Sequence, residues 1–396
     1  MSNEVHSALY LSVPFCKSKC SFCNFASGVF SRQLFDRYVA HLEQAIASSP
    51  QVAEECGTAF DPILDSVYLG GGTPSVLAPD QLRRVMQAIR ATFTLAAGVE
   101  FTVEIAPGTL SEEILAVLVE ASVNRVSLGV QSFVDQETRA VGRLHNRETT
   151  LADVERLRAA GIAEISIDLI AGLPYQTEES WRRSLDDLIA LRPPHASVYM
   201  LEVDDDSRLG RELIAGGERY HAHHVPDEAL TVALYEQAAD SLNAAGIAQY
   251  EISNFAHAGH ESRHNLRYWQ RQPYFGFGVE ASAMLPAPLP GEPHRALRIS
   301  QVDSLDALLG GAKPERTVVG EQQAIEETYF LGLRQTKGVE LVAIKQEFGI
   351  DAVDRYREVI AAQVERGLLE IEDGWLRLTR RGRLLSNDVF AEFLTE

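Results

Sequence analysis

Apolar residues follow two different spacings along the first two thirds of the chain. Short runs rich in valine, isoleucine and tyrosine are typical of buried strands. Between them, apolar residues recur every three or four positions, as in amphipathic helices. The expected strands are 8–13, 66–69, 100–104, 125–130, 164–169 and 196–201. The expected helices include 80–93, 111–121, 150–160 and 178–191.

This alternation of strand and helix predicts an α/β fold on a parallel sheet with right-handed crossovers. The pattern alone leaves open whether the sheet is open or curls into a partial barrel. In both arrangements, functional side chains gather where the strands end and the next loops begin. We therefore expect the chemistry of this protein at the carboxyl ends of the strands.

A second, smaller unit follows a proline-rich segment. Residues 285–295, LPAPLPGEPHR, contain four prolines and a glycine, which exclude a regular helix and indicate a linker or excursion. We expect a boundary that divides the chain into 1–285 and 286–396. The expected elements of the second part are helices at 321–334, 351–366 and 380–394 and a hairpin at 368–379 with its turn at Asp373-Gly374. Together they predict a small winged-helix-like α+β domain.

Charge and composition exclude several classes of protein. The 396 residues include 56 acidic and 36 basic side chains, a formal charge of −20, which disfavours binding to nucleic acid. We find no apolar run of about 18 residues, so no transmembrane segment is expected. The first residues lack the features of a secretory signal, so we expect a cytoplasmic protein.

Three of the four cysteines stand close together directly after the first expected strand. Cys16, Cys20 and Cys23 have the spacing C-x3-C-x2-C, whereas Cys56 is isolated and structurally incidental in our interpretation. In a reducing compartment such a group indicates a metal or redox centre rather than disulfides. Structural zinc needs four ligands, and no fourth lies nearby in sequence. A 4Fe-4S cluster held by three thiolates, with one iron left open, fits better.

Several motifs along the chain resemble those of the radical SAM superfamily, and more narrowly those of the oxygen-independent coproporphyrinogen III oxidases and their relatives. The motifs are YLSVPFCKSKCSFC (10–23), YLGGGTPS (68–75), GVQSF (129–133), VGRLHN (141–146), IDLIAGLPYQT (167–177), YEISNFA (250–256), SRHNLRYW (262–269) and LTRRGRLLSNDVF (378–390). The resemblance implies a partial (β/α)6 TIM-like barrel of the radical SAM type in 1–285 and a HemN-like domain in 286–396. It also implies that the open iron binds S-adenosylmethionine.

The same resemblance assigns S-adenosylmethionine contacts to particular residues. The glycine triplet at 70–72 permits close backbone approach to a small ligand. Glu104, Gln131 and Asp168 fall on successive strands, so they could face one cavity, although ordinary ion pairs are the alternative. Carboxylates suit ribose hydroxyls and Arg143 suits a carboxylate. The implied contacts are Tyr10, Phe22, Gly71, Gly72, Thr73, Glu104, Gln131, Arg143 and Asp168.

One departure separates this chain from the oxidases. Their cysteine signature continues to a fourth cysteine on the substrate or second-nucleotide side of the cavity, where this chain has Phe25. A phenyl ring cannot act as a polar or redox group, so the sequence resembles the HemW branch of haem chaperones. That branch carries the H-N-x-x-Y-W motif found here at 264–269. His264, in a dense aromatic segment, is the candidate haem ligand; the alternatives are a hydrogen-bonded core histidine, or ligation by His223, His224, His257 or His260.

The expected function is therefore a HemW-like protein that binds haem and passes it to an acceptor protein. In this superfamily an electron donor such as flavodoxin or ferredoxin reduces the cluster. The reduced cluster then cleaves S-adenosylmethionine to methionine and a 5'-deoxyadenosyl radical. The sequence leaves open whether that cleavage occurs here, and we assign no catalytic residue. The first alternative is oxidative decarboxylation of coproporphyrinogen III in porphyrin biosynthesis. The second, radical modification of RNA, is disfavoured by the acidic charge.

Overall fold

The computed structural model describes residues 6–394. A twelve-stranded sheet forms the body of the molecule, in the order β12-β11-β10-β9-β1-β2-β3-β4-β5-β6-β8-β7. Its centre confirms the predicted α/β fold, because β1 to β6 are parallel neighbours in chain order. These strands are β1 (Ser7–Val13), β2 (Ile63–Gly71), β3 (Thr94–Ile105), β4 (Arg125–Gln131), β5 (Glu164–Ala171) and β6 (His195–Met200).

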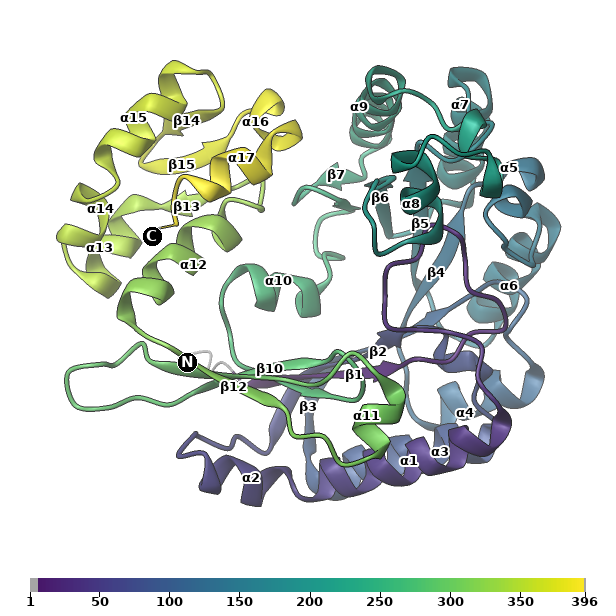
Figure 1. Cartoon of the computed structure of the whole chain (residues 1–396), viewed down its shortest axis with the longest axis horizontal. Helices are drawn as coiled ribbons and strands as arrows, with labels where there is room; N and C mark the ends of the chain where they lie inside the picture. The colour runs from purple at the N-terminus through teal and green to yellow at the C-terminus, as the bar shows by residue number, and fades with distance from the viewer. Residues whose placement is uncertain (1–5, 395–396) are drawn as a thin grey trace.

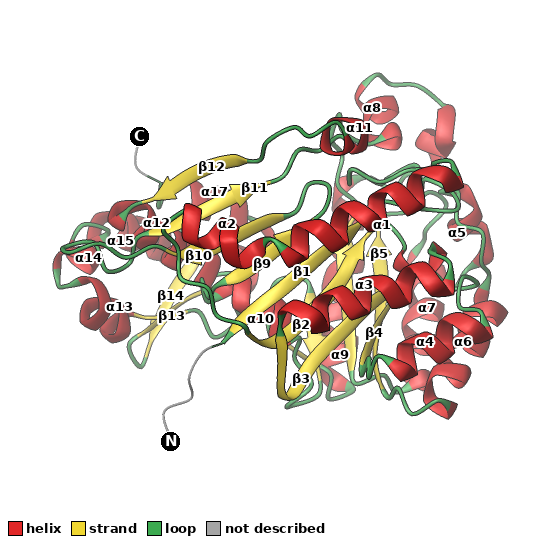
Figure 2. Cartoon of the chain, turned by 90° about the horizontal axis from the view of Figure 1, so that it is seen from below, coloured by secondary structure: helices red, strands yellow, loops and turns green. Residues whose placement is uncertain are grey.

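Helices cover the outer face of the curved sheet (Figures 1 and 2). Their buried residues form the main hydrophobic core against the strands. The Ser111 hydroxyl accepts from Ile114 N at 3.2 Å and caps the N-terminus of α4. The helices are α1 (Arg32–Ala47), α2 (Ser49–Glu55), α3 (Pro79–Thr92), α4 (Glu112–Glu120), α5 (Asp135–Ala140), α6 (Arg147–Ala159), α7 (Glu178–Leu191) and α9 (Glu228–Ala244).

Six further strands that the sequence pattern did not predict extend the sheet at both edges. One edge adds β9, parallel to β1, followed by an antiparallel run. These strands are short, and their partners are distant in sequence, so local spacing carries little signal for them. They are β7 (Ala248–Gln249), β8 (Asn254–Ala256), β9 (Tyr274–Phe277), β10 (Ser282–Pro286), β11 (Ala296–Ser300) and β12 (Glu315–Val319).

The proline-rich segment joins β10 to β11 within this sheet. The expected boundary at 285/286 therefore cuts β10, and residues up to Val319 still pair with the large sheet. A second hydrophobic core begins with residues of α12 (Glu321–Gly332). We place the boundary between the two units near Gly320, because the prolines interrupt a hairpin loop rather than separate two cores.

The second unit is a small α+β body above the open side of the arc (Figure 1). Its three-stranded antiparallel sheet has the order β13-β15-β14. The predicted hairpin is confirmed, with Asp373 and Gly374 both at positive φ, as a tight two-residue turn requires. Its elements are β13 (Val339–Glu340), α13 (Leu341–Phe348), α14 (Asp351–Asp354), α15 (Arg357–Glu365), β14 (Leu369–Glu372), β15 (Trp375–Leu378), α16 (Arg380–Leu384) and α17 (Ser386–Ala391).

Short helices complete the chain around the site. The helix α10 lies between the large sheet and the second unit and contacts both β2 and α12 (Figure 1). None of the helices within 6–394 combines the length and apolar character that a membrane span requires. The remaining helices are η1 (Pro74–Val76), α8 (Arg208–Ile214), η2 (Arg219–His224), α10 (Arg263–Trp269) and α11 (Leu305–Leu309).

Candidate functional site

The loop after β1 carries the three clustered cysteines. Two backbone hydrogen bonds close its base, because Cys16 N donates to Gly28 O at 2.9 Å and Gly28 N donates to Pro14 O at 2.9 Å. Cys20 is buried, whereas Cys16 and Cys23 are half-buried. The three thiols lie within electrostatic reach of one another at the carboxyl end of β1.

The surroundings of the thiols set their protonation. Burial raises the pKa of Cys16, and the hydroxyl of Thr73, 3.7 Å from the Cys16 sulfur, acts against this by hydrogen bonding. Burial also raises the pKa of Cys20, and the Arg143 guanidinium opposes that rise. Buried thiolates are costly unless positive charge neutralises them, so this loop is suited to a cationic metal group.

The donor chemistry fits the expected iron–sulfur cluster. Within residues 6–394, no three His, Cys, Asp or Glu side chains converge closely enough to hold a single metal ion. A cubane does not need such convergence, because each thiolate binds a different iron. Cys23, whose sulfur lies 3.6 Å from the Ser27 hydroxyl, is the third soft donor side chain on this loop.

The glycine motif at the end of β2 packs against this loop. Gly72 N donates to Val13 O at 2.9 Å and Thr73 N donates to Phe15 O at 2.8 Å. A Cβ added to Gly72 would lie 2.7 Å from the Val13 oxygen, and Gly71 has a φ of +95°. Only glycine satisfies both constraints. The triplet therefore brings the end of β2 against the cysteine loop.

Glu104 on β3 lies beside the same glycines. It accepts hydrogen bonds from the Tyr68 hydroxyl at 2.8 Å and from Gly71 N at 3.1 Å. Burial raises the pKa of Glu104 to about 7, and the nearby charge of Asp168 adds to the rise. This carboxyl group therefore changes charge near neutral pH, unlike an exposed glutamate.

We expect Glu104→Gln to remove a pH-dependent loss of stability. The unfolded carboxyl has its ordinary pKa of 4.5, so between pH 4.5 and about 7 the folded chain binds more protons than the unfolded chain. The stabilisation from this group is present at low pH and is lost as the pH rises through about 7. The free energy of unfolding of Glu104→Gln, measured in urea, should therefore rise relative to that of the parent as the pH increases from 4.5 to about 7. Glu148→Gln, which changes an exposed carboxylate, is the control; a constant difference between Glu104→Gln and the parent would contradict the assignment.

Arg143 lies between the acidic residues of the site. Its Nη2 donates to Gly129 O at 2.7 Å, and its charge lowers the pKa of Glu104 and Asp168 against the dominant effect of burial, which raises both. Asp168 accepts from the Ser127 hydroxyl at 2.8 Å. The Arg143 Nε is buried and has no hydrogen-bond partner within the described residues. An unpaired guanidinium donor of this kind suits the carboxylate of a bound ligand.

Two other expected contacts have different surroundings. Gln131 ends β4 in the left-handed region, with a φ of 69°, and is buried. Phe22 is half-buried and packs against Val141, Ile170 and Leu173. Phe22 therefore anchors the cysteine loop on a small apolar cluster.

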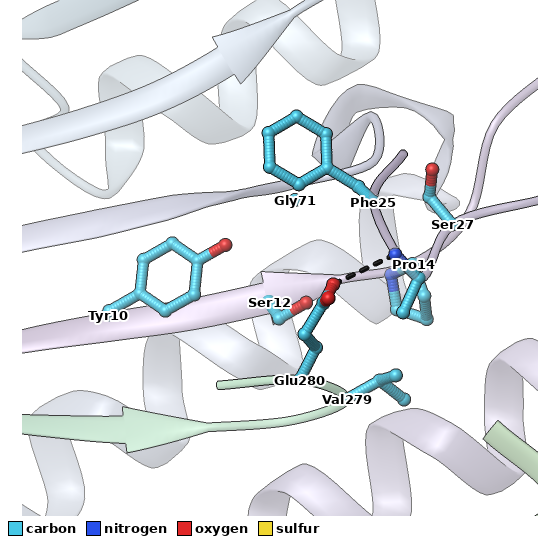
Figure 3. Close-up of a pocket in the computed structure, with 9 residues that line it drawn as sticks. Tyr10, Ser12, Pro14, Phe25, Ser27, Gly71, Val279 and Glu280 are labelled. Atoms are coloured by element: carbon cyan, nitrogen blue, oxygen red, sulfur yellow. Dashed lines mark hydrogen bonds between the residues drawn. The ribbon is translucent and has the colours of Figure 1, made fainter. Parts of the chain in front are cut away.

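A cavity of about 180 Å³ opens beside the cysteine loop (Figure 3). Figure 3 shows Tyr10, Phe25 and Glu280 on its walls. Burial and, secondarily, the charge of Glu104 raise the pKa of Tyr10, so its hydroxyl stays protonated. Phe25 is 58% exposed, so its ring faces solvent rather than packing in the core. The lining residues are Tyr10, Ser12, Pro14, Phe25, Ala26, Ser27, Gly71, Val279 and Glu280.

Glu280 joins the loop after β9 to the cysteine loop. Its Oε2 accepts from Ala26 N at 2.8 Å, and its own N donates to Val302 O at 2.9 Å. The residue has a φ of 61°, a conformation that costs a non-glycine residue about 1 kcal/mol. No sequence motif indicates Glu280, because neither its backbone angle nor its hydrogen-bond partner can be read from local spacing.

His264, on α10, is buried with both ring nitrogens hydrogen-bonded. Its Nδ1 lies 2.9 Å from the Ser66 hydroxyl and its Nε2 lies 2.9 Å from the Tyr268 hydroxyl. Burial lowers its pKa to about 3, so the ring is neutral. Its ring also stacks 5.1 Å from that of Tyr68. Haem ligation by His264 would require one of these hydrogen bonds to break.

Comparison with known proteins supports the same division of the chain. The model of the radical SAM superfamily matches residues 10–188, and that of the HemN C-terminal domain matches 320–385. The structure of the Escherichia coli coproporphyrinogen III oxidase HemN superposes with a TM-score of 0.82 at 23% identity, over 98% of this chain and 90% of that one. This similarity establishes the fold.

Full-length relatives decide the family. A heme chaperone HemW from Bacillus subtilis is 34% identical over 391 residues, covering 98% of this chain and 99% of that protein. The heme chaperone HemW of Lactococcus lactis is also 34% identical, over 98% and 97% of the two chains. The chain belongs to the HemW family of radical SAM proteins. A mitochondrial radical S-adenosyl methionine domain-containing protein 1 from Bos taurus is 32% identical over 84% of this chain.

Within this HemW-family chain, the structure adds residues that motif reading did not select. Tyr68 belongs to the quoted YLGGGTPS motif, yet its bond to Glu104 depends on the pairing of β2 with β3. Glu100 lies on β3 beneath α10 and accepts from His264 N at 2.9 Å. No local signal indicates that contact, because the two residues are 164 positions apart.

Proposed function

We propose that this protein is a haem chaperone that holds a 4Fe-4S cluster and S-adenosylmethionine, binds haem and transfers it to an acceptor protein. The observation that carries the proposal is the match along 98% of the chain to relatives named heme chaperone HemW. Phe25 supports it, because an exposed phenyl ring stands in the cavity wall where the oxidases have a cysteine.

The residues of the site suit these cofactors. Cys16, Cys20 and Cys23 would hold the cluster, which when reduced supplies an electron for cleavage of a sulfonium bond. Gly71 lines the cavity beside that loop, and the lack of a side chain at Gly72 lets the end of β2 pack against the loop backbone.

The side chains around the glycines would orient the nucleotide. Glu104 and Asp168 offer carboxylate oxygens to ribose hydroxyls, and the unpaired Arg143 Nε offers a donor to the ligand carboxylate. Tyr10, Thr73 and Gln131 would be the remaining polar and aromatic residues around the nucleotide. Reduction would require an electron donor such as flavodoxin or ferredoxin.

Oxidative decarboxylation of coproporphyrinogen III is the second candidate, because the fold matches that of HemN. Phe25 argues against that reaction, because its side chain, unlike the cysteine of the oxidases, cannot transfer a proton or an electron. Radical modification of RNA is a weaker candidate for a chain with a formal charge of −20.

Haem titration combined with a decarboxylation assay separates these functions. Anaerobically reconstituted protein should bind about one haem per chain, observed as a saturable Soret band. Incubation of the reduced protein with S-adenosylmethionine and coproporphyrinogen III should release no carbon dioxide. Stoichiometric release of carbon dioxide without haem binding would refute the chaperone function and favour the oxidase function.

We expect Glu280→Gly to loosen the cysteine loop without destabilising the fold. Glycine relieves the positive φ but removes the acceptor for Ala26 N, a hydrogen bond worth about 1 kcal/mol. Cluster loss to a chelator should become about fivefold faster, while the urea midpoint stays nearly unchanged. Glu280→Gln keeps an acceptor and should retain the parental rate. Equal rates for Glu280→Gly and the parent would show that this hydrogen bond does not hold the loop.

A further inference from the structure

A haem chaperone needs an accessible iron ligand, and most histidines of this chain are engaged elsewhere. His195 is buried with its Nδ1 2.8 Å from the Ser166 hydroxyl and its Nε2 2.9 Å from the Tyr250 hydroxyl. His264 is held in the same manner, and the buried His145 contacts Val130 O at 3.0 Å. His6, His257, His260 and His294 have hydrogen bonds to protein partners as well.

Three histidines in η2 have a different environment. His221, His223 and His224 are exposed within the sequence RYHAHH. The ring of His224 lies 4.0 Å from the ring of Tyr175 on one side and 4.0 Å from the ring of His223 on the other. Within the described residues, no hydrogen bond to the rings of His223 and His224 is found, whereas His221 Nδ1 lies 2.9 Å from the Tyr175 hydroxyl. The ring nitrogens of His223 and His224 are therefore available to bind a metal.

The backbone holds this histidine tract in an unusual conformation. Tyr220 and His221 have φ values of 55° and 60°, and Tyr175 has a φ of 70°. Three non-glycine residues in the left-handed region cost stability and persist only where surrounding contacts impose them. Here Tyr175 N donates to His224 O at 2.9 Å and ties the tract to the loop after β5.

The tract also reaches the cysteine loop through α8. Leu209 N donates to Ser21 O at 2.8 Å, and Arg208 donates to the backbone oxygen of Lys19. The Arg208 guanidinium lies over the Tyr220 ring, 5.4 Å from its centre. In Figure 1 the loop after β1 lies beside α8. The histidine tract thus contacts α8 through Tyr220, and α8 in turn donates two hydrogen bonds to the loop that carries the cysteines.

We propose that His223 and His224 form the haem-iron binding site of this protein, with Tyr175 and Tyr220 as the adjoining aromatic surface. The inference rests on the proposed function and names the ligands of that same haem. Exposed imidazole nitrogens suit haem iron, and the site needs no rearrangement of the buried His264. Tyr220 is 38% exposed, and Ile214 at the end of α8 is 64% exposed, which leaves apolar surface for a porphyrin edge.

Ferric haem titration into the full-length reconstituted protein tests this site. The double variant H223A/H224A should bind haem at least about tenfold more weakly and lose the spectrum of an imidazole-ligated iron, which added free imidazole should restore. His257→Ala, which removes a half-buried imidazole bonded to Gly246 O, should behave like the parent. His223 and His224 are both exposed, so the cluster content and circular dichroism of the double variant should match those of the parent.

The possible outcomes separate the site from the proposed function. A parent that binds no haem refutes the chaperone function and the site with it. A parent that binds haem and a double variant with the same affinity and spectrum refute the site alone, and loss of binding in His264→Ala would then favour that residue. Zinc titration gives the last outcome: a double variant that loses zinc but keeps haem would make the tract a divalent-cation site and overturn the inference.

Discussion

Cys20→Ala is expected to abolish retention of the iron–sulfur cluster. Cys20 is the most buried of the three thiols, and Arg143 already offsets part of the effect of burial on its pKa. Loss of one of three protein ligands should weaken cluster binding by more than about 100-fold, the upper range for changes that affect only the surroundings of metal ligands. Iron and acid-labile sulfide should fall close to zero after anaerobic reconstitution and desalting.

Cys56→Ala is the matched control for that experiment. Cys56 is the C-cap of α2 and packs on the main core. Its replacement should leave iron, sulfide and visible absorption unchanged. A Cys20→Ala protein with full iron and sulfide content, or a parent that contains zinc and no sulfide, would refute the assignment of the triad.

Glu100→Ala should cause the largest loss of folding stability among the changes considered. Glu100 is 5% exposed and accepts hydrogen bonds from Arg263 N at 3.0 Å and His264 N at 2.9 Å, at the start of α10. Its carboxylate also lies 3.7 Å from Arg125, which is itself buried. Removal leaves two unpaired backbone donors, and the buried Arg125 guanidinium keeps only its 3.8 Å pair with the partly exposed Glu164 and its bond to His260 O. We expect a loss of about 3–5 kcal/mol in the free energy of unfolding.

Chemical unfolding in urea measures this loss directly. Asp354→Ala, which breaks the exposed ion pair of Asp354 with Arg357 at 2.7 Å, should cost less than about 1 kcal/mol. If Glu100→Ala and Asp354→Ala lose similar amounts, then Glu100 does not anchor α10. A large loss would also show that the segment containing His264 is fixed by the barrel beneath it.

The clustered cysteines and the glycine motif could be identified from sequence because their information is local. Cys16, Cys20 and Cys23 lie on one loop, so their spacing already restricts them to one site. The six parallel strands were predictable because each is a short apolar run between amphipathic helices. The turn at Asp373-Gly374 was predictable because those residues favour positive φ.

Partners distant in sequence were decided only by the folded chain. The parallel pairing of β9 with β1 places Glu280 against the cysteine loop, and no local pattern contains that pairing. Burial likewise separates the histidines, because packing encloses His264 between Ser66 and Tyr268 and leaves His223 exposed.

The sequence by itself predicted the cysteine group, the six parallel strands and the family motifs, because each is a pattern of residues a few positions apart. Only the tertiary structure decided which buried charges meet, where the two units divide and which imidazoles reach solvent. Those properties depend on contacts such as that of Glu100 with His264, which folding forms across 164 positions.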